Sequence, residues 1–124
     1  MQQAHNSFKT KTNKAMVARV RAILVDRFPA CFVPSGEMKK PLKIGIGQDI
    51  AHAIPELGSY EIGVALLDYT HGARYCEPAS IEGAPRFNLE GKEDGKITHN
   101  EAAHMRGRLE RFLSQHPKVS AQVE

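Results

Sequence analysis

The chain has 124 residues, enough for one domain with its own core and too few for two ordinary domains. Apolar residues make up 41% of it, but no run approaches the ~18 consecutive apolar residues that cross a bilayer, which excludes a membrane-spanning helix. The first residues lack the apolar stretch of a secretory signal, and the two cysteines, Cys31 and Cys76, have no metal-ligand spacing. We therefore expect a cytoplasmic protein with two reduced thiols.

Charge is unevenly distributed along the chain, although its net value is only +3. Residues 1–45 carry nine Lys and Arg side chains against two acidic ones, whereas residues 46–70 carry four acidic side chains and no Lys or Arg. A polyanion-binding face produces an asymmetry of this kind. A solubilising surface with a basic tail would produce it equally well, so charge alone does not decide between the two.

Residues 1–12 are polar and basic and are expected to form a flexible tail. A helix is predicted from Asn13, which can cap it, to Phe28, because the residue before Pro29 is pushed out of the α region. Apolar side chains recur at helical spacing along this helix and need a partner surface. They are Met16, Val20, Ile23 and Leu24.

Short elements are predicted in the middle of the chain. Residues 42–46 alternate in polarity as a short strand does, and a short helix is predicted over residues 47–54. A second helix is predicted over residues 59–69. A third follows directly, with Thr70 as its N-cap, and should run only until Pro78.

Residues 86–89 and 95–97 flank a turn-rich stretch and predict a β-hairpin. Thr98–Glu101 matches a capping box and predicts a last helix. Its apolar side chains are expected to face inward; they are Ala102, Met105, Leu109, Phe112 and Leu113. The sequence therefore predicts one compact domain over residues 13–115, mainly α with one or two small β-hairpins, and a short tail over 116–124.

No motif for catalysis or for a cofactor stands out. Residues 45–50 are similar to a dinucleotide-binding loop, but the third glycine and the βαβ unit are missing, and a tight strand-to-helix turn explains the glycines better. The six histidines are scattered, and His99 and His104 do not have the i, i+4 spacing of two ligands on one helix face. No nucleophile–base pair and no Walker loop are present. We expect no enzyme activity, no cofactor, no metal and no small-molecule substrate.

Two arginines stand beside aromatic residues, in the pairs Arg74–Tyr75 and Arg86–Phe87. Such a pair offers a bidentate phosphate ligand and a π-surface, and both are used to bind single-stranded nucleic acid. Free amides at a helix start over residues 70–73 would also suit a phosphate oxygen. Taken alone, each pair is explained better by an aromatic ring in the core beside a solvated arginine.

Five segments share a wider pattern. They are R-F-P-A-C-F at 27–32, P-L-K-I-G-I with Q-D-I within 41–50, L-L-D-Y-T at 66–70, R-Y at 74–75, and G-A-P-R-F-N-L-E-G at 83–91. With these segments in this order and spacing, the chain resembles the ProQ/FinO domain family of bacterial RNA chaperones, as a minimal single-domain member. The resemblance runs from about residue 16 to residue 113.

The resemblance implies an RNA chaperone and post-transcriptional regulator that binds small RNAs and mRNA 3′ ends at terminator hairpins with a U-rich tail. We expect a monomer, because the sequence has no long heptad repeat and no apolar patch. Lys43 would contact backbone phosphate. Arg74 and Tyr75 would line a pocket for the tail, with Tyr75 against the terminal nucleotides, and Arg86 would bind phosphate or the terminal ribose. The full RNA-binding set implied in this way is Lys39, Lys40, Lys43, Thr70, His71, Arg74, Tyr75 and Arg86.

One departure from the family concerns the helix over 59–70, which lacks the basic residues that relatives often carry there. Lys39, Lys40 and the basic cluster within 9–21 are expected to compensate. Two other functions stay open. A non-specific binder of duplex nucleic acid would hold DNA as well as RNA, and a protein-interaction module would dock a basic partner on the acidic segment 49–68.

Overall fold

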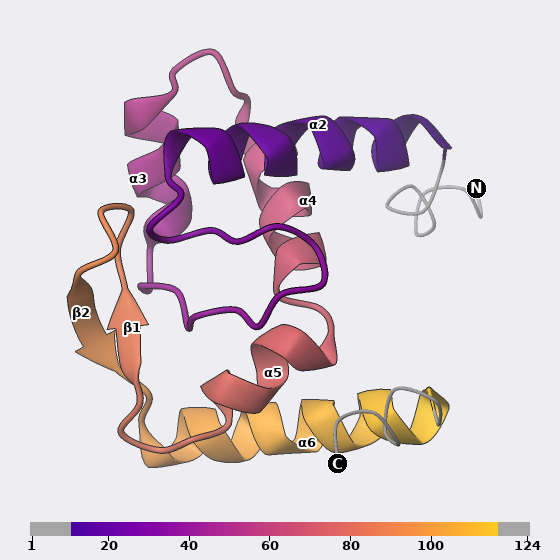
Figure 1. Cartoon of the computed structure of the whole chain (residues 1–124), viewed down its shortest axis with the longest axis vertical. Coiled ribbons are helices and arrows are strands. Elements are labelled where there is room, and N and C mark those ends of the chain that lie inside the picture. Colours follow the sequence, from indigo (N-terminus) through magenta and orange to yellow (C-terminus); the bar gives the residue numbers. More distant parts are fainter. Residues whose placement is uncertain (1–10, 117–124) are drawn as a thin grey trace.

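A computed structural model gives the fold and describes residues 11–116 (Figure 1). Within these residues it contains five helices and one two-stranded antiparallel sheet. The elements are α2 (Lys11–Arg27), α3 (Ile46–Ala53), α4 (Ser59–Tyr69), α5 (Ala73–Ala79), β1 (Pro85–Phe87), β2 (Glu93–Lys96) and α6 (His99–Gln115). The tails expected at 1–12 and 116–124 lie outside the described residues, apart from Lys11, Thr12 and His116.

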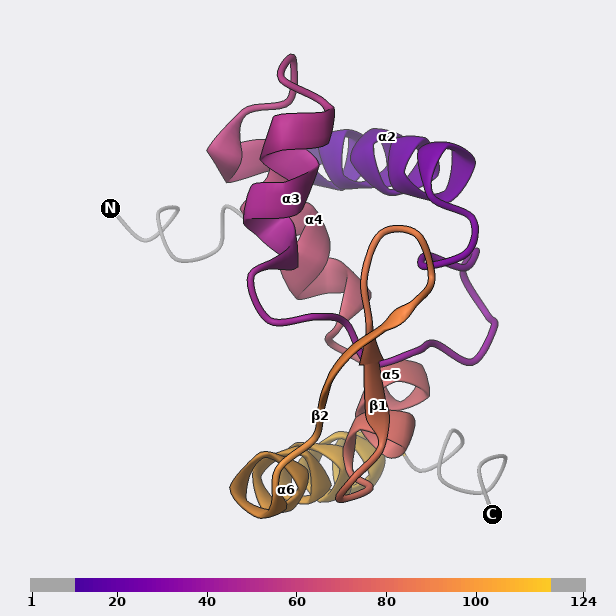
Figure 2. The same ribbon diagram turned by 90° about the vertical axis from the view of Figure 1, so that its left-hand side faces the viewer.

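The helices α2 and α6 lie toward opposite ends of the molecule, with α3 beside one end of α2 and with α4, α5 and the long segment 28–45 leading from α2 to α6 (Figure 1). Helix α2 packs on α4, α3 packs on α4, and α5 packs on α6. The β1–β2 hairpin lies along one side, and its tip approaches the chain just after α2 (Figure 2). One continuous apolar core joins these elements, which confirms the predicted mainly helical domain with a small hairpin.

Helix α2 buries the apolar stripe that its sequence predicts. Val20 and Leu24 are almost completely buried, and Met16 and Ile23 pack against the same core. The helix is already formed at Lys11, where the described residues start, so the prediction of Asn13 as its N-cap is wrong. Since Asn13 lies inside the first turn, its side-chain amide is available to another element and donates to the Tyr60 hydroxyl at 3.0 Å.

The strand predicted over residues 42–46 is reduced to a single bridge between Leu42 and Phe87. On either side of this bridge, Phe87 donates to the Pro41 carbonyl and Lys43 donates to the Phe87 carbonyl, both at 2.9 Å. The ladder cannot continue because Gly45 adopts a left-handed conformation (φ 87°) and turns the chain directly into α3 at Ile46. The tight turn predicted from the glycines is therefore confirmed, and it is what ends the strand.

The N-cap prediction for Thr70 is wrong. Thr70 ends α4, where its hydroxyl donates to the Leu66 carbonyl at 2.9 Å, and Gly72 is the N-cap of α5. Helix α5 also continues one residue past Pro78. Proline has no N–H to donate to the carbonyl four residues earlier, so the Arg74 carbonyl is free within the helix. The backbone N–H of Lys39 donates to it at 3.1 Å, which ties the segment 28–45 to α5.

The hairpin and the last helix follow the sequence closely. Strands β1 and β2 pair antiparallel, and the Asn88 side chain accepts from two backbone N–H groups of the turn. The capping box at the start of α6 is confirmed: the Glu101 carboxylate accepts from Thr98 N–H at 2.9 Å while Thr98 Oγ1 accepts from Glu101 N–H. Of the apolar side chains expected inside, Ala102 is fully buried and Met105 packs on the core; the half-buried ones are Leu109, Phe112 and Leu113.

Both cysteines are free and completely buried. Burial raises the pKa of the Cys31 thiol to about 11, so this thiol is protonated and unreactive at neutral pH. Among residues 11–116, no helix is long and apolar enough to cross a membrane.

The hairpin tip provides a test of the fold. Gly91 has a φ of +82°, and a Cβ at this position would lie 2.6 Å from Ala30 Cβ and 2.8 Å from the Ala30 carbonyl oxygen. Gly91→Ala should therefore lower the free energy of unfolding by at least about 2 kcal/mol, as measured by urea denaturation. The matched control is Gly63→Ala, at an open position inside α4, which should raise stability by roughly 0.5–1 kcal/mol. Equal effects of the two substitutions would contradict this packing.

Candidate nucleic-acid interface

The predicted RNA-binding residues come from three parts of the chain that meet around the segment 39–43. The Lys39 N–H contacts the Arg74 carbonyl in α5, and the Leu42 N–H donates to the Tyr75 hydroxyl at 3.1 Å. From β1, Arg86 donates to the Leu42 carbonyl at 2.8 Å. Both backbone polar groups of Leu42 are thus bonded to side chains from other elements, and residues distant in sequence are held together at this point.

Tyr75 and Arg86 lie inside this junction and not on its surface. Tyr75 is only 4% exposed, and burial raises the pKa of its hydroxyl, which stays neutral and accepts the Leu42 N–H. The Arg86 side chain is 13% exposed and forms an ion pair with Glu101 at 3.1 Å. Its Nε is buried without a hydrogen-bond partner among the described residues. The Tyr75 ring therefore packs in the core. In this arrangement no face of the ring is exposed for the predicted contact with nucleotides.

Lys40 and Lys43 flank the hairpin. Lys40 is exposed; its ammonium donates to the Ala30 carbonyl at 3.0 Å and lies 5.1 Å from the centre of the Phe87 ring. The Lys43 ammonium pairs with Asp49 at 2.7 Å and with Asp94 at 3.9 Å. The hydrogen bond to Asp49 raises the pKa of Lys43. Lys43 is therefore firmly charged, but a phosphate would have to compete with two carboxylates for it.

Lys39 has a different environment from the other two lysines. It is 9% exposed, and its ammonium lies 4.8 Å from the centre of the Tyr69 ring. The Arg21 guanidinium lies 5.1 Å from the same ring centre and pairs with Asp68 at 2.7 Å. Sequence reasoning missed Arg21 and Asp68 because they are 47 residues apart and no local pattern relates them.

The remaining predicted residues, Thr70 and His71, lie at the junction of α4 and α5. The Thr70 hydroxyl is engaged in ending α4, and the Thr70 carbonyl accepts from Arg108 of α6 at 3.4 Å. His71 is exposed, with its ring edge-to-face against Phe112. His71 also lines a groove of about 800 Å³ between α2 and residues 33–35, to which no other member of the predicted set contributes.

The basic and acidic segments of the sequence partly neutralise each other in the fold. Three of the four acidic residues in segment 46–70 form ion pairs with basic residues of the first 45. These pairs are Lys43–Asp49 at 2.7 Å, Arg19–Glu61 at 2.9 Å and Arg21–Asp68 at 2.7 Å. The acidic segment is therefore largely neutralised by the chain itself, and a role as a docking face for a basic partner loses its basis. Among residues 11–116, no three His, Cys, Asp or Glu side chains gather to hold a metal ion.

Comparison with known families decides the affiliation. The model of the ProQ/FINO family matches residues 13–122, nearly the whole chain. The chain belongs to the ProQ/FinO family. The resemblance carried by the five sequence segments is confirmed.

Curated relatives agree with this assignment. The chain is 34% identical over 108 residues to the RNA chaperone ProQ of Aliivibrio fischeri (strain MJ11), which covers 85% of this chain and 49% of the relative. It is 36% identical over 107 residues to the RNA chaperone ProQ of Aeromonas salmonicida, covering 84% and 48% respectively. The chain thus spans about half the length of these relatives.

Two solved structures share the fold. One is a FinO-like RNA chaperone from Neisseria meningitidis, with a TM-score of 0.62, 24% identity, and coverage of 75% of this chain and 93% of that one. The other is the solution structure of a ProQ homolog from Legionella pneumophila, with a TM-score of 0.64, 25% identity, and coverage of 77% and 81%. The predicted ProQ/FinO-like fold is therefore confirmed.

The position of Tyr75 leads to a stability prediction. Tyr75→Phe removes the acceptor of the buried Leu42 N–H and should lower the free energy of unfolding by about 1–3 kcal/mol. Tyr60→Phe is the matched control, because the Tyr60 hydroxyl takes part in an exposed hydrogen bond, and its effect should stay within about 0.5 kcal/mol. Urea denaturation of both variants measures the difference. Comparable losses in the two proteins would argue against an interior role for the Tyr75 hydroxyl.

Glu101 gives a prediction for pH dependence. Hydrogen bonds from Thr98 N–H and then from Arg86 hold the pKa of Glu101 below its usual value of 4.5. A depressed folded-state pKa contributes stability that is present above the unfolded pKa and is lost as the pH falls through the folded pKa. Glu101→Gln should therefore be less stable than the wild type at neutral pH and should lose less stability on acidification below about pH 4.5. Urea midpoints measured at several pH values test this, and parallel pH curves for the two proteins would refute it.

Proposed function

We propose that this chain is an RNA-binding domain that holds structured RNA with a single-stranded 3′ tail and acts in the cytoplasm as an RNA chaperone, without chemistry on the RNA. Its relatives are named RNA chaperones. The observation that carries the proposal is the docking of segment 39–43 on α5 and β1, which gathers basic side chains from separate elements around one rigid stretch of backbone.

Such an arrangement suits RNA on physical grounds. An RNA duplex hides its base edges in a deep, narrow groove, so recognition relies on shape, phosphates and 2′-hydroxyls. Side chains that bind phosphate must be held in register with the backbone of the ligand. Lys40 and Arg74 are exposed and belong to elements that the Leu42 junction fixes relative to each other.

Two largely buried residues of the predicted set, Tyr75 and Arg86, hold in place the backbone that carries the exposed basic side chains. Tyr75 and Arg86 hold the Leu42 peptide from both sides and so determine where the next residue, Lys43, lies. We assign these two residues a positioning role in RNA binding.

A gel-shift titration tests the proposal. The RNA is a GC-rich hairpin with a 3′ U tail, and the comparison ligands are the hairpin without its tail, the hairpin with a 3′-phosphate, and the same sequence as DNA. Tight binding that needs the tail and a free 3′ hydroxyl supports the proposal. Equal, weak binding to all four ligands that salt abolishes would instead indicate a non-specific binder of duplex nucleic acid.

Arg74 provides the sharpest substitution. It is exposed, and the structure shows no hydrogen bond or ion pair of its guanidinium with residues 11–116. Arg74→Gln should weaken binding of the tailed hairpin about tenfold and make the salt dependence shallower by about 0.7–0.9 in the log–log slope. Arg111→Gln, an equally exposed arginine on α6, is the matched control and should leave affinity unchanged. Equal losses from both substitutions would show that only total charge matters.

A further inference from the structure

The Lys39 side chain is buried along most of its length, and its ammonium forms no ion pair with residues 11–116. The residue is 9% exposed, and no hydrogen bond or ion pair reaches its Nζ from any residue within 11–116. The contact that the structure does show is with the face of Tyr69, 4.8 Å from the ring centre. A cation–π contact offsets only part of the cost of removing an ammonium from water.

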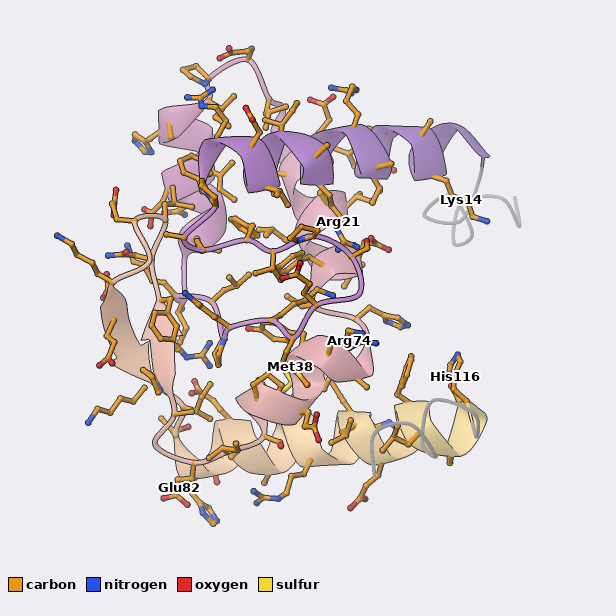
Figure 3. The ribbon with its side chains drawn as sticks, in the orientation of Figure 1. Lys14, Arg21, Met38, Arg74, Glu82 and His116 are labelled. Atoms are coloured by element: carbon orange, nitrogen blue, oxygen red, sulfur yellow. The ribbon has the colours of Figure 1, made fainter. Side chains whose placement is uncertain are left out.

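Two further cations surround this ammonium. The Arg21 guanidinium lies over the same Tyr69 ring, and Arg74 is held next to Lys39 through the hydrogen bond between the Lys39 N–H and the Arg74 carbonyl. Figure 3 shows Arg21 reaching from α2 toward the segment 28–45, and Arg74 at the start of α5 near the same segment. Burial first, and then the charge of Arg21, lower the pKa of Lys39; Asp68 opposes this effect and Arg74 adds to it.

One carboxylate faces these three cations. Asp68 pairs with Arg21 at 2.7 Å. Among the described residues, neither Lys39 nor Arg74 forms an ion pair of its own. The cluster Arg21, Lys39, Arg74 and Asp68 therefore carries a net charge of about +2 beside an aromatic ring. Three cations held close to one carboxylate repel one another, and an anionic ligand that completes the site would offset that repulsion.

We propose that Lys39, Arg21 and Arg74 form a site for a single phosphate group, with Asp68 as the internal competitor that occupies Arg21 when the site is empty. This proposal rests on the proposed function in one respect, because a phosphodiester of bound RNA is the expected source of the group. Free phosphate has the same chemistry, and the experiment separates the two sources. Phosphate fits because guanidinium groups bind its oxygens in a bidentate manner and an ammonium supplies a point charge.

The first arm uses inorganic phosphate and the full chain without RNA. Thermal unfolding is measured in sodium phosphate and in sodium chloride of equal ionic strength, for the wild type, Lys39→Met and Lys96→Met. Lys96 is an exposed lysine on β2 and serves as the control. Phosphate should raise the midpoint of the wild type and of Lys96→Met but not that of Lys39→Met. Without phosphate, Lys39→Met should be at least as stable as the wild type, because it removes the repulsion between Lys39 and the charges of Arg21 and Arg74 and keeps the apolar stem.

The second arm uses the hairpin with a 3′ U tail. Lys39→Met should weaken its binding about tenfold to a hundredfold and reduce the salt slope by about 0.7–0.9, while Lys96→Met changes neither quantity. Asp68→Asn removes the competitor and should change affinity in the opposite direction, tightening RNA binding severalfold. This gain cannot arise from a damaged fold.

The outcomes separate the two proposals. Stabilisation by phosphate that depends on Lys39, with unchanged RNA binding in Lys39→Met, would support a phosphate site and overturn RNA as its source. If neither phosphate nor RNA binding depends on Lys39, the site is overturned, whereas tight binding of the tailed hairpin by the wild type still supports the proposed function. A wild type that ignores RNA overturns the proposed function, and the phosphate arm then decides the site by itself.

Discussion

The backbone of Leu42 is the point on which the arrangement of this domain depends. Its N–H is bonded to the Tyr75 hydroxyl and its carbonyl to the Arg86 guanidinium, so two side chains replace the partners that a neighbouring strand would supply. A buried peptide group without partners would cost several kcal/mol, roughly 2–7 on transfer scales, so this interaction constrains α5, β1 and the segment 39–43 together. Arg86 continues the network through Glu101 into the capping box of α6. The surface proposed for RNA is thus built on a junction of interior hydrogen bonds.

The distribution of charge has two parts with different roles. Between α2 and α4, Arg19 and Arg21 pair with acidic residues and join two helices that also share the apolar core. The exposed pair Arg19–Glu61 contributes little stability, typically ~0–1 kcal/mol, so the main effect of both pairs here is to neutralise the acidic side chains of α4. Lys39 and Arg74, which form no ion pair in the described structure, lie around the segment 39–43 and α5, and other cations without an ion pair lie on α2, the hairpin and α6.

Lys39 shows how function and stability are opposed in this region. Its backbone is held by a carbonyl that Pro78 leaves free in α5, and this fixes the lysine where its side chain packs on an aromatic face and forms no ion pair. A hydrophobic residue would suit the same space without the cost of removing a charge from water. Retaining an ammonium at such a position is understandable in a protein whose ligand is a polyanion.

The sequence by itself determined the elements whose signals are local. The apolar spacing of α2, the capping box of Thr98 and Glu101, and the glycine turn before α3 each depend on residues within a few positions of one another, and the structure contains all three. The family was also readable, because it is carried by short motifs in a set order, and the match over residues 13–122 confirms it.

Only the tertiary structure decided which charged and aromatic side chains are free. Arg21 meets Asp68 across 47 residues, and Tyr75 meets Leu42 across 33, so no pattern in the chain could show that the first is paired and the second buried. The errors have the same origin. Asn13 and Thr70 are suitable capping residues by type, but the helix boundaries around them are set by packing against other elements and by where Gly72 and Pro78 fall, not by the propensity of one residue.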